Sequence, residues 1–102
     1  MSRDEEAFPR VFLRIKELYK KGFVSYSYHS KLRKEQRRID TPDIENLIRY
    51  GRMVEKRTEP GFKTPTYTIE GFSVDGEKIG CSVAVVDNIL IIVTAFRRDR
   101  RR

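Results

Sequence analysis

Hydrophobic side chains near the start of the chain recur at the three- to four-residue spacing of an amphipathic helix. Acidic residues precede this stretch and two lysines follow it, which matches the partial charges at the two ends of a helix. Gly22 supplies a stop signal directly afterwards. The pattern therefore predicts a helix over residues 5–21, with an apolar stripe that comprises Phe8, Val11, Phe12, Ile15, Leu18 and Tyr19.

Between Gly22 and Gly51 the spacing of apolar residues changes from that of a strand to that of a helix. Apolar and polar positions alternate over residues 23–28, which predicts a short strand. Residues 30–38 return to a helical but very polar pattern, with Leu32 as the main apolar anchor. A Thr-Pro pair, suited to an N-cap and a first helical turn, then opens a helix over 42–50 that Gly51 ends.

After Gly51 the pattern is that of strands separated by turn residues. The turn signals are Pro60-Gly61, Asp75-Gly76 and Asp87-Asn88. The predicted strands span 53–57, 66–74, 78–86 and 89–96. The first of them is short and charged, as expected of a strand at the edge of a sheet.

Taken in order, these elements predict an α+β protein whose N-terminal helices pack on a mainly antiparallel sheet. A length of 102 residues corresponds to one domain. We expect that domain to span residues 1–96 and a basic tail to follow over 97–102.

The chain carries a net charge of +7, and the positive charge is confined to particular segments. Residues 29–63 contain ten basic and six acidic side chains, and residues 97–102 contain five Arg and one Asp. Residues 64–96, by contrast, contain one basic and four acidic side chains. Clustered positive charge favours a polyanion or an acidic protein as partner, and RNA fits this layout better than a small-molecule substrate.

Residue counts exclude several kinds of site. One His and one Cys cannot supply a zinc site of the common kind, and no glycine-rich phosphate loop is present, so we expect no metal and no small-molecule cofactor. Cys81 lies in an apolar strand pattern and is interpreted as a small buried hydrophobe. No stretch is long and apolar enough to span a bilayer, and the acidic start does not resemble a signal peptide. We therefore expect a cytoplasmic protein without membrane contacts.

Three residues, His29, Arg33 and Arg37, follow one another at four-residue spacing. If the polar helix begins near His29, successive members are about 40° apart and share one face. Guanidinium groups bind phosphate in a fixed fork and stabilise its developing charge. An imidazole titrates near neutral pH and can move the proton of a 2′-hydroxyl. The stripe therefore suits metal-free RNA cleavage, although the same spacing is ordinary on a solvated helix face.

Further residues are predicted to bind RNA. Tyr67 lies just beyond a basic loop, where an exposed aromatic ring can stack on a base. Lys63 in that loop, and Arg97 and Arg98 in the tail, are the expected phosphate contacts. Most of the other aromatic residues are interpreted as packing within the core or on the sheet.

The run from His29 to Ile39, His-Ser-Lys-Leu-Arg-Lys-Glu-Gln-Arg-Arg-Ile, resembles the signature of a family of domains of unknown function, DUF4258. That family is similar to the BrnT and RelE/ParE toxins of bacterial toxin–antitoxin pairs. In its signature a strand ends in His-Ala, and Arg follows four and eight residues after the His. The acidic helix start at 43–45 and the strand over 92–97 also resemble family motifs, so the resemblance covers residues 23–97.

Two positions depart from the family pattern: Ser30 stands where Ala is usual, and Arg38 where Gly is usual. Neither change removes a proposed chemical group. Thr94 matches a Thr of the family and is therefore added to the candidate catalytic residues. The resemblance implies a compact RelE/BrnT-like sheet with helices on one side, a metal-independent endoribonuclease activity and an acidic antitoxin as partner.

The leading hypothesis is thus a toxin-like RNA endonuclease. His29 is expected to act as general acid and base, Arg33 and Arg37 to hold the phosphate, and Thr94 and Tyr67 to complete the site. The alternative is a non-catalytic RNA-binding or protein-interaction module on the same fold, which would use its basic surface only for docking. A third class, a small-molecule enzyme, is disfavoured because the sequence contains no cofactor motif.

Overall fold

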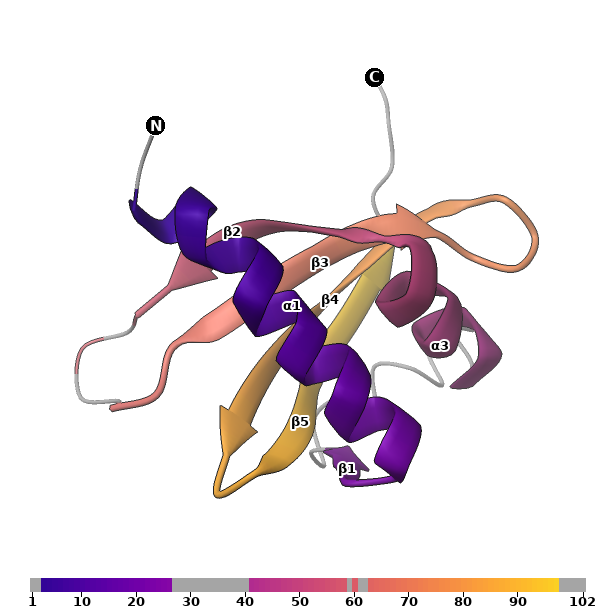
Figure 1. Cartoon of the computed structure of the whole chain (residues 1–102). Coiled ribbons are helices and arrows are strands. Elements are labelled where there is room, and N and C mark those ends of the chain that lie inside the picture. The colour runs from indigo at the N-terminus through magenta and orange to yellow at the C-terminus, as the bar shows by residue number, and fades with distance from the viewer. Residues whose placement is uncertain (1–2, 27–40, 59, 61–62, 98–102) are drawn as a thin grey trace.

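The computed structural model of the protein describes residues 3–26, 41–58, 60 and 63–97. Within these residues, two helices pack against one five-stranded sheet (Figure 1). The helix predicted over 30–38 lies outside the described residues. The elements are α1 (Arg3–Lys21), β1 (Val24–Tyr26), α3 (Thr41–Tyr50), β2 (Arg52–Arg57), β3 (Thr66–Phe72), β4 (Lys78–Val86) and β5 (Ile89–Arg97).

The strands of the sheet are ordered β1-β5-β4-β3-β2. Strands β2 to β5 form an antiparallel meander, in which each strand pairs with the next one along the chain. This arrangement confirms the predicted α+β class, the mainly antiparallel sheet and the edge position of the charged strand β2. The short strand β1 pairs in parallel with β5, which the order of elements did not predict. It occupies the edge that the meander leaves open, and Leu90 N–H donates to the Phe23 carbonyl at 2.8 Å beside it.

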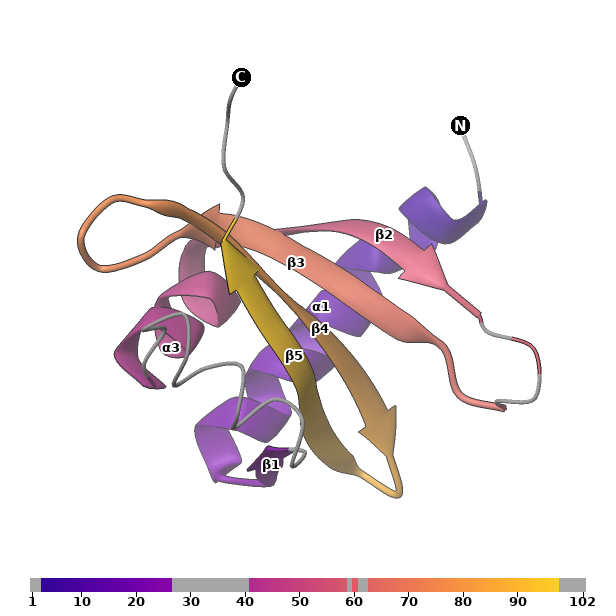
Figure 2. The same cartoon turned by 180° about the vertical axis from the view of Figure 1, so that it is seen from behind.

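Both described helices lie on the same face of the sheet. In Figure 1, α1 runs diagonally in front of the strands and α3 lies beside it, near the turn between β3 and β4. Figure 2 shows the reverse side, with β3, β4 and β5 in front and α1 behind them. In the described part of the chain, the second face of the sheet therefore carries no helix. Neither of the two helices has the length and apolar composition that a membrane span would need.

The hydrophobic core fills the space between the helices and the sheet. Its helical members recur at three- to four-residue spacing and its strand members alternate, so two sequence periods converge on one core. Cys81 is fully buried there, which confirms its interpretation as a small core residue. The buried cluster comprises Ile15, Leu18, Ile44, Leu47, Ile48, Met53, Ile69, Ile79, Cys81, Val83, Leu90, Ile92 and Ala95.

The first helix ends in a glycine cap, as the stop signal predicted. Gly22 has a φ of +85°, its N–H donates to the Tyr19 carbonyl at 3.1 Å, and the Phe23 N–H donates to the Leu18 carbonyl at 2.9 Å. This Schellman pattern satisfies two carbonyls at the end of the helix, and it requires a left-handed residue that Gly adopts without strain. The cap turns the chain from α1 into β1.

The end of α3 touches the backbone of β3. A Cβ atom placed on Gly51 would lie 2.5 Å from the Leu47 carbonyl oxygen and 2.7 Å from the Glu70 carbonyl oxygen. A Cβ placed on Gly71 would lie 3.1 Å from the Cα atom of Gly51. Both positions need Gly because the two backbones approach so closely that no side chain fits between them.

The strand predicted over 66–74 was too long, because it ends at Phe72. The N–H of Val74 donates to Asp43 Oδ1 at 2.9 Å, and Asn46 Nδ2 donates to the Phe72 carbonyl at 2.8 Å. Two side chains of α3 thus bind backbone groups that would otherwise extend the ladder. A local turn begins at the same place, because the Gly76 N–H donates to the Ser73 carbonyl at 3.0 Å and the Glu77 N–H donates to Ser73 Oγ at 3.0 Å. The end of β3 therefore coincides with both this turn and the contacts from α3.

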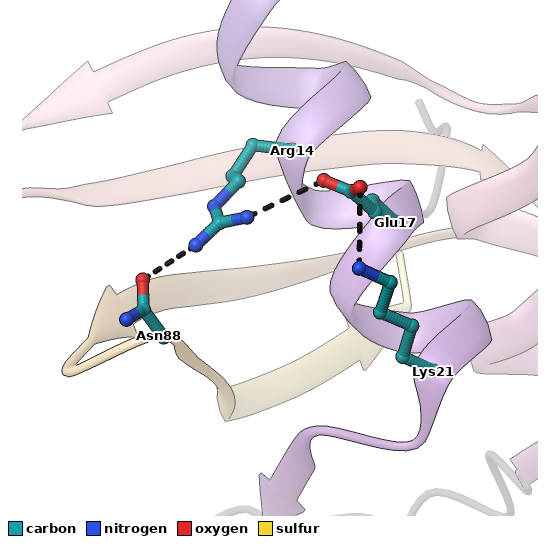
Figure 3. A network of polar contacts seen from close by, with 4 residues as sticks. All are labelled: Arg14, Glu17, Lys21 and Asn88. Atoms are coloured by element: carbon teal, nitrogen blue, oxygen red, sulfur yellow. Dashed lines mark hydrogen bonds and ion pairs between the residues drawn. The ribbon is translucent and has the colours of Figure 1, made fainter.

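The turn between β4 and β5 is the predicted two-residue hairpin. Asp87 and Asn88 have φ values of 52° and 64°, which is the combination of a type I′ turn. Asn88 Oδ1 accepts a hydrogen bond from Arg14 of α1, and Glu17 pairs with both Arg14 and Lys21 (Figure 3). Lys21, together with Arg14, holds the pKa of the Glu17 carboxyl below its usual value. These contacts tie α1 to the tip of the hairpin, and β5 then continues to Arg97.

Candidate nucleic-acid interface

The sheet face opposite the helices is hollowed into an open groove of about 760 Å³, a volume typical of ligand-binding clefts. This is the face turned to the viewer in Figure 2. Strands β3, β4 and β5 form most of its floor, and β2 and the residues before β3 add its charged side. The lining comprises the hydroxyl residues Thr64, Thr66, Thr68, Ser82 and Thr94, the apolar residues Ala84, Val86, Val93 and Phe96, and the charged residues Glu55, Arg57 and Lys63.

A row of polar side chains crosses this groove at right angles to the strands. Glu55 pairs with Thr68, Thr68 with Ser82, and Ser82 with Thr94 in the registers of successive strands. Neighbouring strands lie about 4.8 Å apart, so the row extends for roughly 14 Å. We call Thr68, Ser82 and Thr94 the hydroxyl row. Hydroxyl groups both donate and accept hydrogen bonds, so the row suits a polar ligand.

Two β-bulges turn the ends of this polar row toward the groove. The register shifts between Met53 and Glu55 in β2, and again in β5, where Ser82 pairs with Thr94 but the next residue of β4 pairs with Ile92. Met53 and Ile92 are buried in the core, so strict alternation would point Glu55 and Thr94 into the core as well. The extra residue in each strand reverses that orientation. Bulges are frequent beside functional sites because they redirect side chains in this way.

Two cationic side chains lie at the β2 end of the groove. Arg57 pairs with Thr66 in the register of β2 and β3, and its Nη2 atom lies 3.6 Å from Glu55 Oε2. The Arg57 side chain is 62% exposed, and Lys63 is also exposed. An exposed ion pair adds little to stability. An anionic ligand can therefore compete with Glu55 for the guanidinium of Arg57.

An aromatic ring lies in the part of the groove farthest from these cations. Phe96 of β5 pairs with Gly80 of β4. A Cβ atom placed on Gly80 would lie 2.7 Å from Phe96 Cε1 and 2.8 Å from Phe96 Cζ. The ring therefore covers the glycine and occupies the space that a side chain would take. Phe96 itself remains partly exposed, whereas Gly80 beneath it is buried.

Raised pKa values among the described residues belong to groups outside the groove. Burial raises the pKa of Tyr19 to about 12, and the neighbouring Tyr26 adds to the effect. Burial likewise raises the pKa of Tyr26, and it raises that of the Cys81 thiol to about 12. None of these three residues lines the groove, and all three are protonated at neutral pH.

Comparison with known proteins identifies one family. The profile described as Domain of unknown function (DUF4258) matches residues 26–97. The chain belongs to the DUF4258 family. This confirms the predicted resemblance to DUF4258, while no curated protein and no solved structure matches the chain. All residues that line the groove lie inside the matched range of this DUF4258 protein, whereas α1 precedes it.

The DUF4258 fold brings two of the predicted site residues together and separates a third. Thr94 and Lys63 both line the groove. Tyr67 lines a different, smaller hollow together with Arg10 of α1, and it pairs in register with the core residue Val83. Tyr67 therefore lies on the helix-covered face, and the sheet separates it from Thr94.

The remaining predicted site residues lie away from the groove or outside the described part of the chain. Arg97 ends β5, and its Nη1 atom lies 3.0 Å from Glu77 Oε1. It is not among the lining residues of the groove. The residues that the structure does not describe, whose roles stay predictions, are His29, Arg33, Arg37 and Arg98.

Sequence reasoning missed Arg57, Phe96 and most of the hydroxyl row. A signal for one member of the row was present, because Thr66 and Thr68 alternate within a predicted strand and so share one face of it. Alternation does not reveal whether that face is covered by helices or open. Only the packing of α1 and α3 on the other side makes it a groove.

Proposed function

We propose that this DUF4258 protein binds RNA in the groove on the sheet face opposite α1 and α3. The observation that carries the proposal is the convergence of Arg57, Lys63 and the hydroxyl row on one groove. Cationic side chains bind phosphate oxygens, and hydroxyl side chains hydrogen-bond to phosphate and to the ribose 2′-hydroxyl. The groove therefore offers cations at its β2 end and hydroxyl groups across the strands.

The charge of the whole chain supports the same ligand. A net charge of +7 attracts polyanions, and each phosphate contact releases counterions from the nucleic acid. Open sheet faces serve as binding platforms in established RNA-binding modules. A purely apolar ligand would remove the hydroxyl row from water without giving it partners, which is unfavourable.

The salt dependence of RNA affinity tests this proposal. The anisotropy of a labelled single-stranded RNA of mixed sequence is measured with the full chain between about 50 and 200 mM salt. Each phosphate contact on a single strand contributes about 0.7 to the slope of log affinity against log salt. We expect the double variant Arg57→Gln/Lys63→Gln to reduce the slope by about 1.4, because two contacts are lost.

A matched control removes the same charge from the opposite face. Arg10 and Lys20 are exposed on α1, so Arg10→Gln/Lys20→Gln lowers the net charge equally and leaves the groove intact. We expect this control to change the slope less than the groove variant does. Equal reductions of the salt slope in the two double variants would show that the phosphate contacts do not lie in the groove. A wild-type protein that binds no RNA at the lowest salt would refute the proposal altogether.

We further propose that RNA held in the groove is cleaved without a metal ion, in the manner of a toxin of the RelE/BrnT kind. The observation that favours cleavage is the position of Thr94, the residue that matches a Thr of the family, in the same groove as the cations. His29 lies within the matched family region and would act as general acid and base. Arg33 and Arg37 would bind the phosphate and stabilise its charge.

Substitution of His29 separates cleavage from binding. The variant His29→Ala is expected to cleave RNA about 10²–10⁴-fold more slowly, with unchanged RNA affinity and an unchanged circular dichroism spectrum. Addition of EDTA is expected to leave the parent rate unaltered. Cleavage by folded His29→Ala at the parent rate would contradict the catalytic role. If the parent binds RNA but cleaves none, alone or with ribosomes, the function is that of an RNA-binding module.

We also propose an acidic antitoxin as protein partner, since an acidic surface complements the same cations. The protein encoded by a short reading frame adjacent to this gene is expected to co-purify with the chain. Its addition should displace labelled RNA from the wild-type protein. Binding without displacement would contradict a shared surface.

A further inference from the structure

The ring of Phe96 is already positioned before any ligand binds. It lies against Gly80, whose missing side chain makes room for it, and it belongs to the groove face two residues beyond Thr94. A ring held in this way loses little conformational freedom when a second flat group packs on it. Base–aromatic stacking uses this kind of surface and is tolerant of sequence, because every base has a flat face.

Phe96 and the cations lie at opposite corners of the groove. Phe96 pairs with Gly80, which pairs with Glu70, whereas Arg57 pairs with Thr66. The four residue steps from Thr66 to Glu70 correspond to about 14 Å along β3, and the three strand spacings from β2 to β5 correspond to about 14 Å across the sheet. The two corners are therefore about 20 Å apart, with the hydroxyl row between them.

We infer that Phe96 is a nucleobase-stacking subsite for single-stranded RNA. One base packs on the ring, and the ribose-phosphate backbone crosses the hydroxyl row toward Arg57 and Lys63. The span is that of a few nucleotides rather than of a single mononucleotide. The inference rests on the proposed RNA binding and names its substrate class, because bases within a duplex are stacked on each other and cannot pack flat on a protein ring.

Phe96 also has a structural role that any test must separate from stacking. An aromatic ring that covers a strand glycine stabilises the sheet by shielding the backbone. Loss of the ring could then weaken RNA binding by loosening β4 and β5. Removal of the bases from the RNA, instead of the ring from the protein, distinguishes the two roles, because a structural role does not depend on the presence of a base.

The experiment measures the affinity of the full chain for three labelled RNAs: a single strand, its duplex, and the same strand with abasic residues. The variants are Phe96→Leu, which keeps an apolar side chain, and Phe96→Tyr, which keeps the ring. We expect wild-type protein to bind the single strand more tightly than the duplex. Phe96→Leu should bind the single strand about 5- to 150-fold more weakly, and Phe96→Tyr should bind nearly as wild type does.

The matched control is Phe72→Leu. Phe72 is 57% exposed at the end of β3 and does not line the groove, so this substitution removes an exposed ring elsewhere. Its affinity for the single strand should equal that of the wild type. On the abasic strand, Phe96→Leu and wild type should bind equally, because the base that would stack is missing.

The outcomes separate this inference from the proposed function. If no RNA binds, both are wrong. If Arg57→Gln/Lys63→Gln reduces the salt slope but Phe96→Leu binds the intact strand as tightly as wild type, RNA binding stands and the stacking subsite is refuted. If Phe96→Leu loses the same factor of affinity for the intact and the abasic strand, Phe96 has a structural role only, and the stacking subsite is again refuted. Should Phe96→Leu not fold, equal affinity of the wild type for intact and abasic strands would refute the subsite instead.

Discussion

Replacement of Gly51 by Ala is expected to destabilise the protein far more than one methyl group usually does. The added Cβ atom would lie 2.5 Å from the Leu47 carbonyl oxygen, 2.7 Å from the Glu70 carbonyl oxygen and 3.1 Å from Ile69 Cγ2. The two oxygens belong to the backbones of α3 and β3 and cannot rotate away. The end of α3 must therefore move off the sheet.

The size of the effect follows from these contacts. Overpacking costs about 1–3 kcal/mol where side chains can adjust. Here the backbone moves, and the Gly51 N–H also donates to the Leu47 carbonyl at 2.8 Å, a hydrogen bond worth roughly 1 kcal/mol. We expect a loss of about 3–4 kcal/mol, a large fraction of the 5–15 kcal/mol that is typical of a folded domain.

Urea unfolding followed by far-ultraviolet circular dichroism measures this loss, with Gly76→Ala as the control. Gly76 has a φ of +89° and no atom within 4 Å of an added Cβ, so its substitution introduces backbone strain without a clash. Strain of that kind costs about 1–2 kcal/mol. A loss for Gly51→Ala no greater than the loss for Gly76→Ala would refute the close contact between α3 and β3.

Three further predictions concern the core and the turns. Burial raises the pKa of the Cys81 thiol from 9.0 to about 12, because the folded protein disfavours the charged thiolate. Folding is therefore unaffected by this group below pH 9, where the thiol is protonated in both the folded and the unfolded state, and it becomes less favourable as the pH rises toward 12. The unfolding free energy should therefore fall by about 1.4 kcal/mol per pH unit above about pH 9, and Cys81→Ala should remove that part of the slope in urea titrations at several pH values. Asn46→Ala breaks the 2.8 Å bond to the Phe72 carbonyl and should lower the unfolding free energy by about 1 kcal/mol; unchanged urea midpoints would contradict the contact. Asn88→Gly relieves the strain of a positive φ but removes the hydrogen bond from Arg14. In an Arg14→Ala background, where that bond is already absent, Asn88→Gly should raise the unfolding free energy by up to about 1 kcal/mol, and in the wild type it should raise it by less. A double-mutant cycle measures the difference.

Much of the fold was accessible from local signals. The helical stripe of α1, the Thr-Pro start of α3 and the hairpin at Asp87 and Asn88 depend on residues close together in the sequence. Their physical causes are side-chain periodicity, capping and backbone φ preferences, all of which act over a few residues. The same holds for Gly22, whose cap needs only the preceding turn of helix.

The candidate site was less accessible, because it depends on contacts between distant segments. A single extra residue in β5 turns Thr94 from the core to the groove, and the sequence over 89–96 alternates too weakly to locate that residue. Tyr67 was expected beside the site, but it belongs to the face on which α1 packs. The position of the Phe96 ring over Gly80 depends on the pairing of β4 with β5 and is not visible in the sequence.

By itself, the sequence determined the two described helices, the approximate spans of the described strands, the mixed α+β class, the buried place of Cys81 and the family of the chain. Only the tertiary structure decided which face of the sheet is covered, how β1 joins the sheet and which side chains meet in the groove. The reason is physical. Alternation defines two faces of every strand, but register, bulges and the docking of a helix from another part of the chain select which face is buried and which one meets a ligand.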